Sequence, residues 1–172
     1  MSASKVMPES LRRHFLRESD AKQVLNDFCR VINANPEQFF GSKPRVELIE
    51  TRQARIFLFN RTPFSVEVQD TMFPTLFFKE VLSFLPQVVV DMGAVPYICS
   101  GADIMAPGIV AVIGDFGEGD FLTVVDQLHR KPLSIGQALF NSETLRAIKR
   151  GKVADNIHYV GDKIWNLLKT II

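Results

Sequence analysis

The stretch VVVDMGAVPYICSGADIMAPG, residues 88–108, contains the change of composition that decides how the second half of the chain folds. It begins with three consecutive valines, which are typical of a buried strand. Residues 100–108 then bring together small residues, one acid, a Met, a Pro and two glycines. Glycine permits positive φ and leaves its backbone uncovered, and proline stiffens a loop. The stretch therefore predicts a strand, a helix over residues 93–101 and a rigid loop of low relief.

The chain has the composition of a globular protein. Its 172 residues are 47% hydrophobic and 23% charged, which fits one ordinary domain or two small ones. The first fifteen residues lack the apolar core of a secretory signal. No apolar run reaches the roughly 18 residues of a membrane helix. We therefore expect a cytoplasmic protein with no membrane association.

The charges and the cysteines point to no particular ligand. There are 20 Lys and Arg against 19 Asp and Glu, so a nucleic-acid site must rest on a local cluster. Cys29 and Cys99 are expected to be reduced thiols, because neither belongs to a CxxC pair. The three histidines show no zinc-ligand spacing to a cysteine. We expect neither a metal nor a cofactor.

Catalytic motifs are also absent from the sequence. GDFGEGD, residues 114–120, carries three acids that would repel a phosphate, and we interpret it as an acidic hairpin turn. Asp91 stands where a strand turns into a helix, and such a residue usually caps backbone N–H groups. Neither GxSxG nor HExxH occurs. The sequence predicts a protein that is not an enzyme.

The first half of the chain has the pattern of a small α+β unit. Apolar spacing over residues 11–32 predicts one helix, or two helices separated near residues 18–20. A period of two then predicts an antiparallel meander of three strands. A further helix must end before Pro86. The expected elements are a helical turn at 35–41, strands at 46–48, 56–58 and 64–68, and a helix at 74–85.

After Pro86 the pattern changes to many short strands separated by turns, which is typical of a small barrel. We place the domain boundary here, with one domain over residues 1–85 and a second over 86–172. No low-complexity linker separates them, so we expect the two to pack together. Beyond the opening stretch, the second domain should hold strands at 109–113, 121–127, 133–138 and 156–160, and a helix at 142–150.

Two parts of the second domain each allow two interpretations. The glycines of residues 100–108 either serve a tight crossover in the barrel or leave a surface that accepts an RNA backbone by shape. The cations of RAIKRGK, residues 146–152, either complement the end of a helix dipole or contact phosphates beside the last strand. Composition alone leaves both choices open.

The order of these residues resembles a PUA domain, the RNA-binding module named for pseudouridine synthases and archaeosine transglycosylases. With the first unit and the ending NIHYVGDKIW, the chain resembles the malignant T-cell amplified sequence family, its archaeal relatives and ligatin. The resemblance implies an α+β fold, in which a small N-terminal α+β (pre-PUA) domain packs on a C-terminal PUA β-barrel with helices. The matching residues are Asp91-x-Gly93-Ala94, Gly101-Ala102-x-x-Met105-x-Pro107-Gly108, Gly119-Asp120, Val124-Val125-Asp126, Leu133-Ser134-Ile135-Gly136-x-Ala138 and Gly151-Lys152.

The same resemblance implies a non-catalytic RNA-binding protein of the translation machinery. Eukaryotic members bind the small ribosomal subunit and, with the density-regulated protein or as part of ligatin, help load or release tRNA in non-standard initiation, reinitiation and recycling. An accessory module for tRNA or rRNA modification and a module that binds a peptide or a domain are the alternatives. The residues implied to contact ribosomal RNA or tRNA are Ser100, Gly101, Ala102, Met105, Pro107, Gly108, Arg150, Lys152, His158 and Tyr159.

Overall fold

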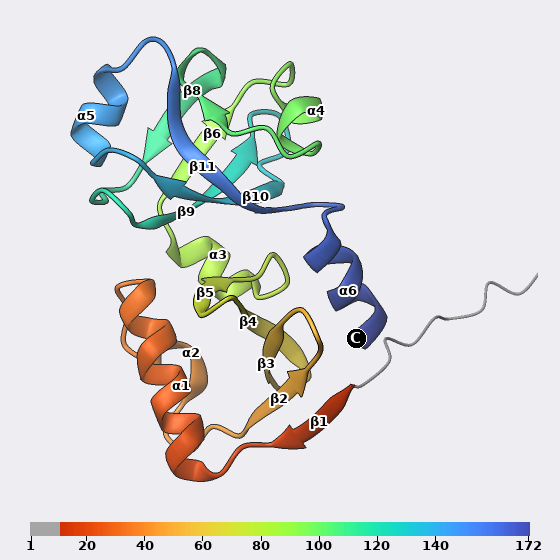
Figure 1. Cartoon of the computed structure of the whole chain (residues 1–172). Coiled ribbons are helices and arrows are strands. Elements are labelled where there is room, and N and C mark those ends of the chain that lie inside the picture. Colours follow the sequence, from red (N-terminus) through yellow and green to blue (C-terminus); the bar gives the residue numbers. More distant parts are fainter. Residues whose placement is uncertain (1–10) are drawn as a thin grey trace, which may run out of the picture.

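A computed structural model describes residues 11–172 (Figure 1). Residues 1–10, with which the predicted first domain begins, lie outside the described residues. The chain forms an N-terminal α+β domain and a second domain around a curled six-stranded sheet, and its last helix lies beside the first domain. None of the helices in residues 11–172 combines the length and the hydrophobicity needed to cross a bilayer.

The N-terminal domain is built on a five-stranded sheet in which each strand pairs antiparallel with the next. This confirms the predicted meander, and one further strand extends it at each edge. The strands are β1 (Arg12–Phe15), β2 (Val46–Glu50), β3 (Arg55–Phe59), β4 (Thr62–Val68) and β5 (Thr71–Pro74).

The helices of this domain are shorter than their apolar patterns predict. They are α1 (Glu18–Val31), α2 (Glu37–Phe40) and α3 (Lys79–Phe84). The expected helix from residue 11 is wrong over its first turn, because β1 pairs there with β2, Phe15 lying opposite Glu47. Residues 71–74 likewise pair with β4 as β5. In both places a strand partner supplies hydrogen bonds that local spacing does not reveal.

Phenylalanine rings fill the core between the sheet and α1. The Phe64 ring centroid lies 5.0 Å from that of Phe28 and 4.9 Å from that of Phe40. Tilted and edge-to-face contacts of this kind add to the stabilisation from burial. Cys29 joins the same core, where burial raises the pKa of its thiol to about 11. Cys99 is half-buried, and both cysteines are free.

The second domain carries one sheet in the order β7-β11-β10-β9-β6-β8, which curls into a half-barrel (Figure 1). The expected strands are present, but the interpretation of residues 114–120 as a hairpin turn is wrong. The strands that this loop joins, β8 and β9, both pair with β6, which lies between them. The strands are β6 (Gln87–Val90), β7 (Ile104–Met105), β8 (Ile109–Ile113), β9 (Phe121–Asp126), β10 (Pro132–Ala138) and β11 (Lys152–Tyr159).

The helices of the second domain also differ from the prediction. They are α4 (Val95–Ile98), the 3-10 turn η1 (Ala106–Gly108), α5 (Ser142–Ala147) and α6 (Lys163–Ile171). The Asn141 side chain caps α5 by accepting the Thr144 N–H at 2.8 Å. Because α5 ends at Ala147, Arg150 lies outside the helix. The helix-dipole interpretation of the cations therefore applies to Arg146 alone.

The final helix joins the two domains. Ile164, Leu167, Leu168 and Ile171 of α6 pack against the core of the N-terminal domain. From the other direction, the Thr123 hydroxyl of β9 donates to the Leu82 carbonyl at 3.0 Å. The expected packing of two units is confirmed. The division between residues 85 and 86 stays a prediction, because α6 follows the second domain in sequence and packs on the first.

Candidate nucleic-acid interface

The loop of small residues forms an accessible surface at the edge of the second domain. Ser100, Gly101, Ala102 and Pro107 are exposed, Met105 exposes 48% of its surface, and Gly108 is half-buried. β7 pairs with the beginning of β11, where Lys152 lies opposite Met105. We call residues 100–108 and 150–152 the shelf.

One amide side chain holds the shelf against β11. Asn156 Nδ2 donates to the carbonyls of Ile98 at 3.0 Å and Ala102 at 2.9 Å. Its backbone N–H donates to Asp103 Oδ1 at 2.9 Å. These bonds tie the turn after α4 to a strand 54 residues later. The sequence does not point to Asn156, because nothing in the neighbourhood of this residue identifies the distant turn.

Replacing Asn156 by Ala is expected to lower the free energy of unfolding by about 1–2 kcal/mol, since the Ala102 carbonyl loses its donor and the Ile98 carbonyl keeps only the Gly101 N–H. Asn166→Ala is the matched control, because Asn166 donates to one carbonyl, that of Gly161, at an exposed site. We expect the control to change stability by less than about 0.5 kcal/mol. Urea denaturation measures both, and equal effects would contradict the role assigned to Asn156.

The glycines of the shelf allow close packing beneath an open surface. Gly101 has a φ of 97°, which L side chains rarely adopt, and a Cβ there would lie 3.0 Å from Tyr159 Oη. At Gly108 a Cβ would lie 3.2 Å from the Ala94 Cβ. Packing and exposure are therefore compatible, because the neighbours lie on the inner side of the loop and its outer side is exposed.

Asp91 completes the frame of the shelf. Its Oδ1 accepts the Ala94 N–H at 2.9 Å, which confirms the predicted capping role. Its own backbone N–H donates to the Gly108 carbonyl at 2.9 Å, so that both ends of the loop meet the end of β6. Within residues 11–172, no group of three or more His, Cys, Asp or Glu side chains is placed to hold a metal ion.

The shelf carries less free positive charge than its sequence indicates. Lys152 Nζ lies 2.9 Å from Asp155 Oδ1 and 3.4 Å from Asp103 Oδ2. The hydrogen bond to Asp155, with the charge of Asp103, raises the pKa of Lys152. Arg146 donates instead to the Gly114 carbonyl at 2.7 Å. Arg150 is exposed and forms no salt bridge with any described residue.

His158 does not belong to this surface. Its side chain is fully buried, with Nδ1 2.9 Å from Asp162 Oδ2. The imidazole ring lies 6.0 Å from the ring of Phe73 in the N-terminal domain. The predicted contact between His158 and RNA is therefore wrong, because alternate side chains of a strand face opposite sides. Tyr159 is half-buried and lies against Gly101.

An exposed tyrosine that was not predicted from the sequence adjoins the shelf. Tyr97 of α4 exposes 70% of its surface. Its carbonyl accepts the N–H groups of Ser100 at 3.1 Å and Ala102 at 3.0 Å. Aromatic side chains are platforms on which unstacked bases lie. The available signal was a tyrosine three residues before the small-residue loop, in a helix too short to bury it.

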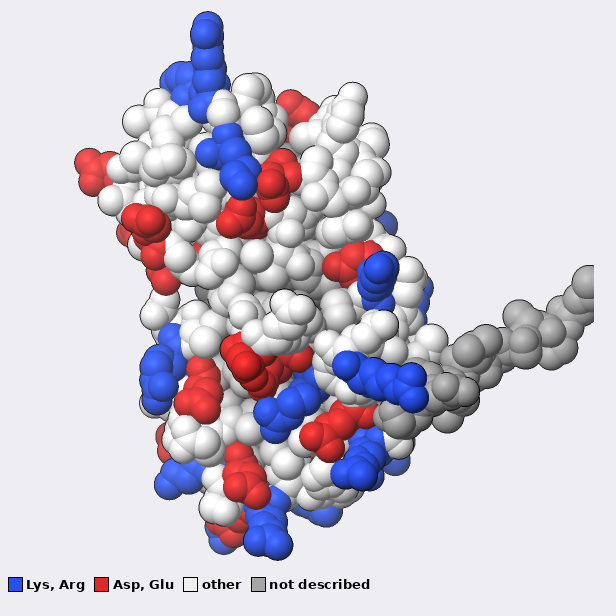
Figure 2. Space-filling model, in the orientation of Figure 1, with Lys and Arg blue, Asp and Glu red and all other residues white. Residues whose placement is uncertain are grey.

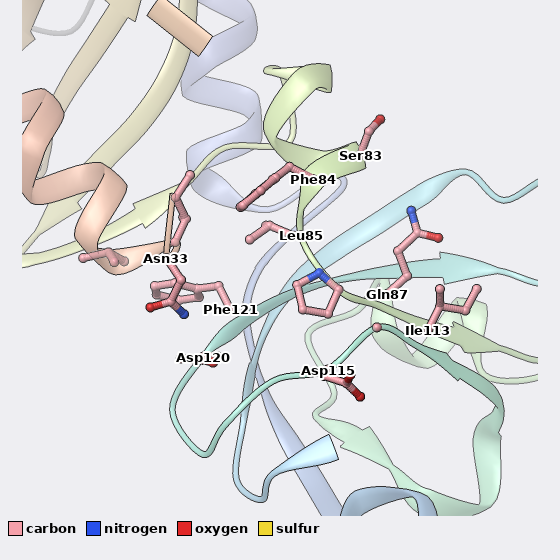
Figure 3. Close-up of a pocket in the computed structure, with 13 residues that line it drawn as sticks. Asn33, Ser83, Phe84, Leu85, Gln87, Ile113, Asp115, Asp120 and Phe121 are labelled. Carbon is pink, nitrogen blue, oxygen red and sulfur yellow. The ribbon is translucent and has the colours of Figure 1, made fainter. Parts of the chain in front are cut away.

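A pocket of about 500 Å³ opens between the two domains, at the opposite end of β6 from the shelf (Figure 3). Phe84, Ile113 and Phe121 form apolar parts of its lining. Asp115 lies 3.5 Å from Arg146, and Asp120 accepts the Gly117 N–H at 2.8 Å. Both acids therefore have structural partners, and the pocket presents no arrangement of nucleophile and base.

Comparison with known proteins matches both domains. The PUA domain family matches residues 86–160, and a domain of unknown function, DUF1947, matches residues 12–79. An uncharacterized protein of Methanocaldococcus jannaschii is 38% identical over 161 residues, which are 92% of this chain and 98% of that protein. Translation machinery-associated protein 20 of Saccharomyces cerevisiae is 26% identical over 140 residues, 76% of each chain.

A shorter match and a solved structure extend this comparison. Malignant T-cell-amplified sequence 2 of Homo sapiens is 30% identical over 86 residues, 48% of each chain. The crystal structure of a hypothetical protein from Pyrococcus horikoshii is similar with a TM-score of 0.76 and 32% identity, over 91% of this chain and 99% of the other. The chain therefore belongs to the family of PUA proteins with an N-terminal DUF1947 (pre-PUA) domain that includes the translation machinery-associated protein 20 and malignant T-cell-amplified sequence proteins.

Proposed function

We propose that this protein binds structured RNA on the shelf and acts, without catalysis, in the translation machinery. The observation that carries the proposal is an exposed shelf of small residues, held rigid by Asn156 and Asp91, in a PUA domain. The relative named translation machinery-associated protein 20 supports the cellular setting.

The geometry favours recognition by shape over attraction by charge. Gly101 and Ala102 expose backbone that a sugar–phosphate chain can approach, and Tyr97 and Met105 offer apolar surface to a base. Arg150 is the shelf cation without an acidic partner in the described part of the chain. Each phosphate contact contributes about 0.7–0.9 to the slope of log affinity against log salt. Few such contacts mean weak binding to free RNA.

A weak RNA surface suits a protein that docks on a large assembly. We propose ribosomal RNA of the small subunit, or tRNA held on that subunit, as the ligand, and initiation, reinitiation or recycling as the step. A protein partner would add contacts that the shelf lacks. The proposed contact residues are Ser100, Gly101, Ala102, Met105, Pro107, Gly108, Arg150, Lys152 and Tyr159, with Tyr97 added from the structure.

Met105→Glu is expected to weaken co-sedimentation with purified small ribosomal subunits at least tenfold, because it places a negative charge where the RNA backbone must approach. Leu128→Glu is the matched control, since Leu128 is exposed by 66% in the turn between β9 and β10. The control should co-sediment like the wild type, and both variants should keep the wild-type circular dichroism spectrum.

Equal binding by the two variants would remove the shelf from the interface. Crosslinking in extract, followed by sequencing of the attached RNA, separates ribosomal RNA from tRNA. Recovery of an RNA-modification enzyme without ribosomal components would favour the accessory-module alternative. A partner retained after RNase treatment would favour a protein-binding module.

A further inference from the structure

A second charged surface lies around β1 of the N-terminal domain. Figure 1 shows β1 far from α4, the helix that precedes the shelf. β1 is an edge strand that pairs with β2 alone, and all four of its side chains are exposed. Phe15 exposes 53% of its surface although large apolar side chains are normally covered. We call Arg12, Arg13, Phe15, Arg17, Lys43 and Arg45 the cationic edge.

The cations of this edge are mostly free of acidic partners. Arg13 is paired with Glu47. The other four, Arg12, Arg17, Lys43 and Arg45, form no salt bridge within residues 11–172. All five are exposed. The cationic edge thus has several available charges where the shelf has one.

An aromatic side chain lies among these charges. The Arg45 guanidinium carbon lies 4.3 Å from the centroid of the Phe15 ring. A cation over a ring face is attracted by the ring quadrupole, which holds both groups in place. The pair therefore places a positive charge against one face of an exposed aromatic ring.

A groove continues from the cationic edge. It measures about 690 Å³ and runs between α1, α2 and the loop of residues 41–45. Leu16 and Pro44 contribute apolar lining, and Lys22, Lys43 and Arg45 contribute charge. Glu18 and Glu37 also line it, so three cations and two acids face the groove. Figure 2 shows Lys and Arg side chains spread over the N-terminal domain with Asp and Glu side chains between them, whereas much of the visible face of the second domain is uncharged.

We propose that the cationic edge is a second RNA-contact surface, which binds a single-stranded segment. Arg17 and Lys43 contact phosphates, and Arg12 reaches a phosphate from the opposite face of the edge strand. An unstacked base lies on the face of the Phe15 ring away from Arg45. Available cations and an exposed aromatic ring favour RNA over an acidic peptide. Every base has a π face that can stack on the ring, whereas a peptide carboxylate can pair with the cations but cannot stack on the ring. A base within a duplex cannot reach Phe15, so a single strand is the preferred form. The inference rests on the proposed function only in taking RNA as the partner.

The test uses the full-length protein and two fluorescein-labelled probes, a 12-nucleotide oligouridylate and a 12-base-pair RNA duplex, followed by anisotropy over a range of salt. The edge variant is Arg12→Gln with Arg17→Gln and Arg45→Gln. The control is Arg30→Gln with Arg52→Gln and Lys79→Gln, which removes equal charge from exposed positions of the same domain. The edge variant should bind the single strand at least tenfold more weakly, and the salt slope should fall by about 1.4, because Arg12 and Arg17 each contribute about 0.7 on a single strand. The control should stay within about threefold of the wild type.

Phe15→Ala tests the stacking contact separately from charge, because it leaves the net charge of the protein unchanged. It should weaken binding of the single strand about five- to a hundredfold, leave duplex binding nearly unchanged and leave the salt slope intact. Each variant is compared with the wild type at a temperature where both give the folded circular dichroism spectrum.

Three results would overturn the inference. Equal losses in the edge variant and the control would show attraction by overall charge. A second outcome is that the edge variant and Phe15→Ala bind the single strand like the wild type, while Met105→Glu still loses co-sedimentation with the ribosomal subunit. The shelf would then be the RNA site, and the cationic edge would not contact RNA. Capture of an acidic protein that persists after RNase treatment and depends on the edge arginines would assign the surface to a protein partner.

Discussion

Phe64→Ala is expected to lower the free energy of unfolding by about 3–5 kcal/mol, the largest change that we predict for this protein. Phe64 is fully buried, and its ring contacts Phe28 of α1, Phe40 of α2 and Phe78 before α3. Truncation leaves a cavity between the sheet and these helical elements. The hydrogen-bonded strands keep the sheet in place, so the cavity cannot collapse. Guanidinium denaturation followed by circular dichroism measures the loss.

Phe15→Ala serves as the control for this prediction, because it removes the same side chain from an exposed position. It should cost about 1 kcal/mol or less, the contribution of a surface cation–π pair. A loss at Phe64 no greater than the loss at Phe15 would contradict the assignment of the core.

Asp162→Ala is expected to lower the free energy of unfolding by about 2–4 kcal/mol, because it removes a helix cap and leaves buried donors unpaired. Asp162 accepts the Trp165 N–H at 2.6 Å and the Tyr159 N–H at 2.9 Å, and it faces His158 Nδ1 at 2.9 Å. These contacts hold the start of α6, which connects the second domain to the core of the first. In the variant, amide hydrogens of α6 should exchange faster than in the wild type, and this increase should be larger in α6 than in the other elements.

The contribution of Asp162 depends on pH in a defined direction. Burial alone would raise the pKa of this carboxyl, but hydrogen bonds from His158 and from the N–H groups of Trp165 and Tyr159 outweigh it and hold the pKa below the ordinary value. A depressed pKa in the folded state stabilises the protein above the unfolded-state value, near 4, and the stabilisation is lost as the pH falls through the folded value.

The matching measurement compares the wild type with Asp162→Asn from pH 7 down to about pH 2. The difference in unfolding free energy should be constant near neutrality and shrink in acid. A difference that persists unchanged at pH 2 would show that the ionised carboxylate is not what stabilises the start of α6.

Part of the candidate site was predictable from the sequence, and part was not. The small-residue loop is exposed as the sequence indicates, and Asp91 caps the turn before it. The charges around the loop were not predictable from a count of cations. Asp155 follows Lys152 by three residues on β11, but only the pairing of β7 with β11 brings Asp103 beside Lys152.

The sequence by itself determined the elements whose signals lie within a few residues. The period of two in residues 46–68 established the meander, Asn35 and Pro36 set the turn that contains α2, and the three valines after Pro86 established β6. In each case the hydrophobic period or the turn chemistry acts between near neighbours, and these neighbours are visible in the sequence.

Tertiary structure alone decided the rest. β1 is a strand because β2 provides a hydrogen-bonding partner, and His158 is buried because β11 turns its side chain toward the N-terminal domain. The Asn156 side chain donates to carbonyls that are 58 and 54 residues away. The cationic edge likewise gathers residues 12–17 and 43–45 only after β1 and β2 pair. Such contacts join segments that are distant along the chain, so their free energy depends on the completed fold and leaves no local pattern.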